Sequence, residues 1–313
     1  MEKNFLIYTT PKSKEFSQTI ADHLGVDLGV IYSERFSDGE VYVRFDQTIR
    51  EKTIFIISRI NLPYENVFEY FLTIDAAKRS SAKEVVCVIP YLPHSRQERR
   101  DGERTSVASR MMADIIQLAG ADRVITLEMH TNAIEGFYKV PVDHLQTTSI
   151  FAAHINSLQL PDICLCSPDF GGLKRIKQYK KHIESELAVI NKERLRPNQV
   201  SHMEIIGEVS GKNVIIIDDM IDTAGTLCKA SEIIMEHGAK SVRAYCTHGL
   251  LTGNAIERIE ASPLESVCIT DTIDRQFTSS KIKVASSRIL FARAIENILC
   301  NRSISQLNNE LLG

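Results

Sequence analysis

The stretch Val214-Ile-Ile-Ile-Asp-Asp-Met-Ile-Asp-Thr-Ala-Gly-Thr226 decides the fold class of this chain. Four apolar β-branched residues lead directly into two adjacent acids, a loop of small residues follows, and Leu227 to Glu236 has a helical pattern. The run Val214 to Ile217 is typical of a strand buried on both faces, as in a parallel sheet. Asp218 and Asp219 would then lie at its carboxyl end, where open α/β sheets bind ligands.

The loop after these acids has the chemistry of a phosphate site. Thr223 to Thr226 can offer backbone N–H groups and hydroxyls to a phosphate at a helix N-terminus. The acids suit ribose hydroxyls or a magnesium ion. The segment can therefore hold both ends of a ribose phosphate. An ordinary buried strand that ends in a solvated turn is the alternative, and it explains neither the paired acids nor the loop that follows them.

Composition limits the class of protein. A length of 313 residues suggests about two domains, and 43% hydrophobic with 25% charged residues is typical of a globular protein. A net charge of −3 does not indicate a nucleic-acid-binding protein. No apolar run approaches the roughly 20 residues that span a bilayer. Seven cysteines, an odd number without a C-x-x-C pair, indicate a reduced cytoplasmic protein with buried thiols.

Strand-like and helix-like runs alternate along the whole chain, which predicts parallel sheets built from βαβ units. The predicted strands are Phe5 to Tyr8, Thr53 to Ser58, Val85 to Ile89, Val124 to Leu127, Ile163 to Cys166, Leu187 to Ile190, Val214 to Ile217, Val242 to Cys246 and Val267 to Ile269. The predicted helices are Glu65 to Ser80, Ala108 to Ala119, Ser149 to Ile155, Cys228 to His237 and Arg288 to Ile298. We expect two domains, 1–145 and 146–313, with the last helix packing back on the first.

Further polar stretches join or follow predicted strands. Phe36-Ser-Asp-Gly-Glu40 is by itself typical of a hairpin turn. The arginines between Pro90 and Arg100 suit a solvated face, but their position after a strand favours an anion site. His130 also follows a strand, so a metal or phosphate role and a structural role both stay open.

Two stretches in the second half repeat this arrangement. In Ser167-Pro-Asp-Phe-Gly-Gly172 the glycine pair permits close approach of the backbone to a ligand, and Asp169 can hold magnesium directly or through water. Asn191 to Pro197 opens a polar stretch after a strand, for which a basic surface loop is the alternative interpretation.

In this order and at these separations, the motifs resemble those of the ribose-phosphate diphosphokinase (PRPP synthetase) family from Phe5 to about Ile298. The resemblance implies an α/β fold with two type I phosphoribosyltransferase-like domains, each a mostly parallel sheet flanked by helices. It implies these site residues: Lys192 and Arg194 for catalysis; Phe36, Asp38, Glu40, Arg96, Gln97 and Arg99 for ATP; Asp218, Asp219, Asp222, Thr223, Ala224, Gly225 and Thr226 for ribose 5-phosphate; and His130 and Asp169 for magnesium.

The resemblance also implies a reaction, a cofactor and an assembly. The diphosphoryl group of Mg-ATP would move to the C1 hydroxyl of ribose 5-phosphate, giving PRPP and AMP for nucleotide biosynthesis, with Mg²⁺ as cofactor. In this family the region around Phe36 reaches the active site of an adjacent subunit, so a homo-oligomer based on a dimer is expected, and hexamers are typical.

Two alternatives stay open. A phosphoribosyltransferase that uses PRPP would share residues 214–226 but would not need the other motifs. A non-catalytic regulatory homologue should have lost catalytic residues, whereas the matching residues are present here.

Overall fold

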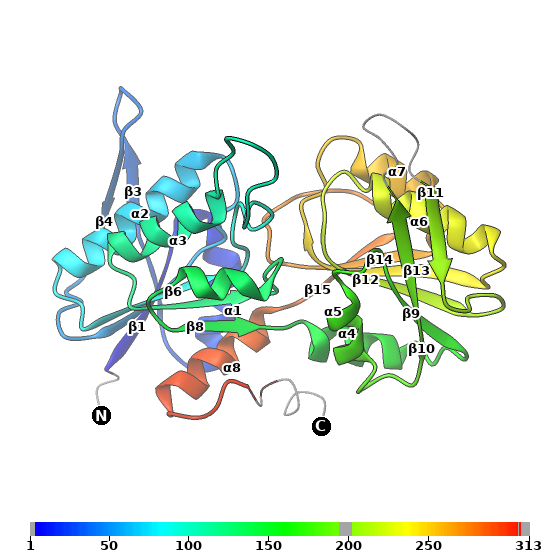
Figure 1. Ribbon diagram of the computed structural model, residues 1–313. Coiled ribbons are helices and arrows are strands. Elements are labelled where there is room, and N and C mark those ends of the chain that lie inside the picture. Colours follow the sequence, from blue (N-terminus) through cyan, green and yellow to red (C-terminus); the bar gives the residue numbers. More distant parts are fainter. Residues whose placement is uncertain (1–3, 194–201, 306, 308–313) are drawn as a thin grey trace. The chain divides into compact units, whose positions relative to one another are not determined.

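The computed structural model describes residues 4–193, 202–305 and 307 (Figure 1). The described chain divides into two compact units. The N-terminal unit comprises residues up to 146 with 272–274 and most of 287–307, and the C-terminal unit comprises 147–271 with 275–286. The assignment of 1–145 and 146–313 as two domains stays a prediction.

A six-stranded parallel sheet organises the N-terminal unit, in the order β2-β1-β5-β6-β7-β8. Its strands are β1 (Phe5–Thr9), β2 (Leu28–Val30), β5 (Thr53–Ile57), β6 (Glu84–Ile89), β7 (Arg123–Leu127) and β8 (Val142–Leu145). Ile54 and Ile56 of β5 pack in one core cluster with Tyr70 and Ile74. The sheet is buried because its central strands are runs of Val and Ile without polar alternation.

Helices α1 (Lys14–Leu24), α2 (Tyr64–Arg79), α3 (Ala108–Ala119) and α8 (Arg288–Leu299), with the short 3₁₀ turns η1 (Pro11–Ser13) and η2 (Asn132–Phe137), complete this unit. Helix α2 packs with α3, and α8 packs with α1. The rings of Phe16 and Phe291, both fully buried, lie 6.0 Å apart between α1 and α8. Helix α8 therefore belongs to the core of the N-terminal unit although it lies near the C-terminal end of the chain.

A separate two-stranded antiparallel sheet, β3 (Tyr32–Arg35) and β4 (Val41–Arg44), extends from this unit as a hairpin (Figure 1). Its turn contains Phe36 to Glu40, as the Ser-Asp-Gly pattern predicts. The Phe36 N–H donates to the Glu40 carbonyl, and Asp38 accepts from the Glu40 N–H at 3.0 Å. The hairpin interpretation of this stretch is confirmed.

A seven-stranded sheet organises the C-terminal unit, in the order β11-β10-β9-β12-β13-β14-β15. All neighbours are parallel except β10 and β11. The strands are β9 (Ile163–Ser167), β10 (Glu186–Glu193), β11 (His202–Ile206), β12 (Asn213–Ile221), β13 (Ser241–Gly249), β14 (Ser266–Thr270) and β15 (Ile282–Ala285), and the helices are α4 (Thr148–Ser157), α5 (Leu173–Tyr179), α6 (Gly225–Glu236) and α7 (Ala255–Ala261).

Strand β12 is buried on both faces, as predicted. Val214 and Ile216 belong to a cluster with Ile234 of α6. Ile215 and Ile217 belong to another cluster, with Ile176 of α5. Because successive side chains of a strand point to opposite faces, the unbroken apolar run fills two separate cores.

Each predicted strand and helix is present, but three strands, β10, β12 and β13, continue well beyond their predicted carboxyl ends. Strand β12 continues to Ile221, so Asp218 and Asp219 lie within it rather than after it, because β13 supplies hydrogen-bond partners beyond the apolar run. Strand β10 continues to Glu193 for the same reason, with β11 as partner. Strands β2, β8, β11 and β15 and helices α1, α5 and α7 were not among the predicted elements. Strand β8, for example, has four residues with a central Asp-His pair, which give no strand pattern.

Two further expectations concern the environment of the chain. Six of the cysteines are buried and Cys300 is exposed, and all are free. Within the described ranges, no helix combines the length and the apolar character needed to cross a membrane.

We expect Phe291→Ala to lower the free energy of unfolding by about 3–5 kcal/mol, because it leaves a cavity between α1 and α8. Phe68→Ala is the matched control, since Phe68 is 58% exposed on α2 and should cost well under half as much. Urea unfolding of both variants measures the difference. Equal costs would show that α8 contributes little to this core.

Candidate active site

Three neighbouring strands bring predicted site residues of the C-terminal unit to one sheet edge. Lys192 lies near the end of β10, Asp169 follows β9, and Asp218 lies in β12. Strands β9 and β12 pair only as far as Cys166 and Ile216, while β12 stays paired with β13 up to Ile221. The carboxyl half of β12 is therefore uncovered on the β9 side, next to the loop that contains Asp169.

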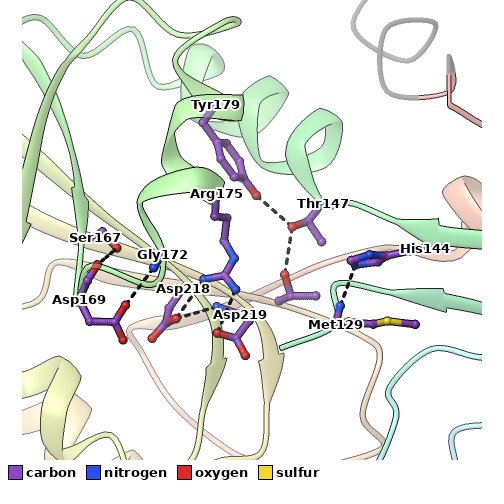
Figure 2. A network of polar contacts seen from close by, with 11 residues as sticks. Met129, His144, Thr147, Ser167, Asp169, Gly172, Arg175, Tyr179, Asp218 and Asp219 are labelled. Carbon is purple, nitrogen blue, oxygen red and sulfur yellow. Dashed lines mark hydrogen bonds and ion pairs between the residues drawn. The ribbon is translucent and has the colours of Figure 1, made fainter. Parts of the chain in front are cut away.

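Asp218 and Asp219 share one arginine in this gap (Figure 2). Arg175 of α5 lies 3.4 Å from Asp218 Oδ1 and 3.1 Å from Asp219 Oδ1. The Asp219 N–H donates to Asp218 Oδ1 at 2.8 Å. The side chains of Arg175 and Asp219 are only 14% and 6% exposed, whereas that of Asp218 is 31% exposed. Two carboxylates thus face one guanidinium, with Asp218 the more accessible.

Burial, and then the negative charge of Asp219, raise the pKa of the Asp218 carboxyl well above its usual range, while Arg175 opposes that rise. The charged form of such a carboxyl is stabilised when a cation or a hydroxyl donor approaches it. Arg175 was not among the residues predicted from the sequence. A basic residue one turn into a helix that follows Gly171-Gly172 was the available signal.

The loop after β12 leads into an uncapped helix N-terminus. Ala224 has the left-handed conformation, with φ 60° and ψ 0°, and no side chain caps α6. Thr223, Gly225 and Thr226 are exposed. Asp222 accepts a hydrogen bond from the Thr252 hydroxyl and is only partly exposed. The first N–H groups of α6, with the positive end of its dipole, can therefore receive an anion.

Asp169 lies in a tight turn that its own side chain stabilises (Figure 2). Its Oδ1 accepts the Gly172 N–H at 2.9 Å, and its carbonyl accepts the Ser167 hydroxyl at 2.6 Å. A Cβ at Gly172 would lie 2.4 Å from Ser167 Oγ, so a larger residue here would displace the hydroxyl that bonds the Asp169 carbonyl. The other oxygen of Asp169 has no partner among the described residues and can accept a water or a cation.

Lys192 and Arg194 are described only in part. The backbone of Lys192 lies in β10, opposite Met203 of β11, so the strand continues into the polar stretch that was predicted to follow it. Its side chain lies outside the described part of the chain, and so does Arg194. Their roles stay predictions.

In the N-terminal unit, adjacent strands place two predicted segments at one edge. Arg96, Gln97 and Arg99 are exposed in the segment after β6, and His130 follows β7. The Gln97 side-chain amide lies 3.2 Å from His94 Nδ1, which orients it.

The turn before His130 is fixed by a neighbouring histidine. The Met129 N–H donates to His144 Nε2 at 2.9 Å (Figure 2). The Nδ1 of the same ring lies 2.7 Å from Glu135 Oε1. Because Nε2 accepts, Nδ1 is the donor to Glu135. His130 is thus placed on a turn tied to β8.

The other predicted ATP residues, Phe36, Asp38 and Glu40, lie in the β3–β4 hairpin rather than at that edge. Phe36 is 50% exposed, and its ring lies 6.0 Å from that of Tyr42, which is 43% exposed. The hairpin thus presents exposed aromatic rings beside its acidic turn.

A metal site is not preassembled from side chains alone. Among the residues that the structure describes, no three His, Cys, Asp or Glu side chains form a group that could hold a metal. His130 and Asp169 belong to different units. Mg²⁺ is commonly held by one or two carboxylates with substrate phosphates and water, and the second oxygen of Asp169 suits that mode.

Comparison with known proteins covers almost the whole chain. The family model for the N-terminal domain of ribose phosphate pyrophosphokinase matches residues 5–120, and that for the phosphoribosyl synthetase-associated domain matches residues 171–309. A ribose-phosphate pyrophosphokinase of Wolinella succinogenes is 39% identical over 97% of this chain and 99% of its own length. That of Clostridium acetobutylicum is also 39% identical, over 98% of both chains. The crystal structure of phosphoribosylpyrophosphate synthetase from Mycobacterium smegmatis matches with a TM-score of 0.88 and 31% identity, over 96% of this chain and 100% of the other.

We expect Asp218→Asn to stabilise the fold at pH 8 and to have less effect at pH 4. A carboxyl whose pKa is raised by folding contributes stability that is lost as the pH rises through that pKa, and Asn has no such loss. A gain of about 1 kcal/mol at pH 8 is the usual scale of a single substitution. Urea unfolding at both pH values measures it, with the exposed Asp101→Asn as control. A larger gain at pH 4 would contradict the burial argument.

Proposed function

The chain belongs to the ribose-phosphate pyrophosphokinase family, and on that premise we propose that it transfers the diphosphoryl group of ATP to the C1 hydroxyl of ribose 5-phosphate, giving PRPP and AMP. The observation that carries this proposal is the edge where β9, β10 and β12 end. There the loop at the start of α6 and the Asp218–Asp219–Arg175 cluster lie side by side. One can bind a phosphate and the other ribose hydroxyls.

We assign the 5-phosphate to the loop. The N–H groups of residues 224–226 and the hydroxyls of Thr223 and Thr226 are suitable donors, and the dipole of α6 favours a dianion there. Asp218 and Asp219 would accept hydrogen bonds from the ribose hydroxyls. Arg175 pairs with both carboxylates and so orients them before the sugar arrives. With both ends of ribose 5-phosphate held, the C1 hydroxyl is restricted to few orientations, which lowers the entropic cost of reaction.

We assign stabilisation of the transferred group to Lys192 and Arg194. Charge accumulates on the phosphoryl oxygens in the transition state, so fixed cations accelerate the transfer. The position of Lys192 at the end of β10, next to the strand that precedes Asp169, supports this role. Bound Mg²⁺, which Asp169 and His130 would help to hold, would neutralise phosphate charge.

We assign ATP to Arg96, Gln97 and Arg99 together with Phe36, Asp38 and Glu40. The first three follow β6, while the others lie in the hairpin. The exposed hairpin aromatics support a homo-oligomer in which this turn completes the site of another subunit, since Tyr32, Phe36 and Tyr42 form one cluster of exposed rings and such clusters mark interaction sites. We also propose a cytoplasmic location, because the free cysteines suit a reducing compartment.

The test is formation of AMP and PRPP from ATP, Mg²⁺ and ribose 5-phosphate. We expect both products in equal amounts and no reaction when Mg²⁺ is chelated. Binding of ribose 5-phosphate without any product would favour a regulatory homologue. Consumption of PRPP with a free base, without its synthesis, would favour a phosphoribosyltransferase.

We expect Lys192→Ala to lower kcat by about 10³-fold, by analogy with the loss of a charge-stabilising cation in other phosphoryl transfers. Lys240→Ala is the control, because Lys240 is an exposed lysine beyond the C-terminal end of α6 and before β13. Steady-state rates and thermal melting of both variants separate catalysis from folding. An unchanged kcat for Lys192→Ala would remove the proposed role.

A further inference from the structure

The phosphate loop contains a backbone conformation that its own sequence does not favour. Ala224 has φ 60° and ψ 0°, in the left-handed region, which residues other than glycine adopt rarely. It is 5% exposed and packs in the core cluster beneath α6. A conformation of this kind persists when surrounding contacts over-determine it. The contacts on the peptide that precedes Ala224 therefore decide how the loop is held.

One side chain from α7 holds that peptide. Arg258 Nη1 donates to the Thr223 carbonyl at 2.9 Å. The same Nη1 would lie 3.6 Å from a Cβ at Gly225, so the guanidinium lies directly beside the start of α6. Arg258 is exposed, and this is the single hydrogen bond of its guanidinium among the described residues. Most of its donor groups are thus not committed to other protein groups.

The position of this bond has a consequence for anion binding. In a planar trans peptide the carbonyl of one residue and the N–H of the next point in opposite directions. A donor that fixes the Thr223 carbonyl therefore also fixes the direction of the Ala224 N–H. The charged donor polarises the peptide as well, which strengthens the N–H on the opposite side as a donor, because linked hydrogen bonds reinforce one another.

We propose that Arg258 is a positioning residue for the 5-phosphate of ribose 5-phosphate. It holds the Thr223–Ala224 peptide so that the Ala224 N–H faces a phosphate monoester dianion, and it adds positive charge behind that peptide. This inference rests on the proposed function for the identity of the ligand. It adds a residue from α7 to a site that sequence motifs confine to residues 218–226. A guanidinium suits the task because it is always charged and its donors have fixed directions.

The experiment compares substitutions that separate the effect of the positive charge of Arg258 from the effect of having a long side chain at this position. Arg258→Ala and Arg258→Gln remove the charge, and Arg258→Lys keeps it. Lys229→Gln is the matched control: it also removes one exposed positive charge, from α6 itself, but Lys229 pairs with Glu232 rather than with the loop. Calorimetric titration with ribose 5-phosphate measures binding without any turnover. Steady-state kinetics give KM for each substrate and kcat.

We expect Arg258→Ala to weaken ribose 5-phosphate binding by about 10-fold or more, the scale of a charge-assisted hydrogen bond. KM for ribose 5-phosphate should rise in parallel, while KM for ATP and kcat change less than about twofold, because the loop contacts only one substrate. Arg258→Gln should resemble Arg258→Ala, Arg258→Lys should recover most of the loss, and Lys229→Gln should bind like the wild type. Thermal melting checks that all variants are folded.

Three results would overturn the inference. Unchanged ribose 5-phosphate affinity in Arg258→Ala is the first. The second is an equal loss of affinity for ATP and for ribose 5-phosphate in Arg258→Ala, which would indicate general damage to the protein. The third is a loss of ribose 5-phosphate affinity in Lys229→Gln as large as that in Arg258→Ala. The proposed function is judged separately on the wild type. If the wild type binds ribose 5-phosphate but makes no PRPP, the proposed reaction fails while the Arg258 comparison by calorimetry still stands.

Discussion

The unequal pairing of β12 is the constraint on which the C-terminal site depends. On one side the pairing with β9 stops at Cys166 opposite Ile216, whereas on the other the pairing with β13 continues to Gly249 opposite Ile221. The carboxyl half of β12 thus keeps strand geometry without being enclosed by β9. The acids gain the rigidity of a sheet while their neighbours on the β9 side remain a loop. A site that must hold a sugar in a fixed orientation benefits from elements of this stiffness.

This arrangement concentrates unfavourable features in a small region. A carboxyl with a raised pKa, a left-handed alanine and an uncapped helix N-terminus occur within eight residues, from Asp218 to Gly225. Each costs stability in the unliganded protein. The cost is offset by the two cores on either side of β12, whose side chains are almost fully buried. A cationic or hydroxyl-bearing ligand with a phosphate would relieve several of these features together.

In the N-terminal unit, too, parallel strands place polar residues at one edge of the sheet. Its parallel strands β6 and β7 deliver an arginine-rich segment and His130 to one edge, and His144 fixes the turn between β7 and His130. The hairpin with Phe36 is the exception, because it lies outside the main sheet and exposes its aromatic rings. Its exposure is one reason for the proposed homo-oligomer.

The sequence by itself determined the α/β class, the central strands and the strand ends at which polar residues gather, because unbroken Val and Ile runs and their breakpoints are local properties. It could not determine the length of β12 or β10, since both extensions depend on partner strands. Nor could it select Arg175 or Arg258 among 37 basic residues. Arg175 lies on α5 and Arg258 on α7, and each contacts a residue far away in the sequence. Contacts of this kind depend on how the helices pack in the folded chain.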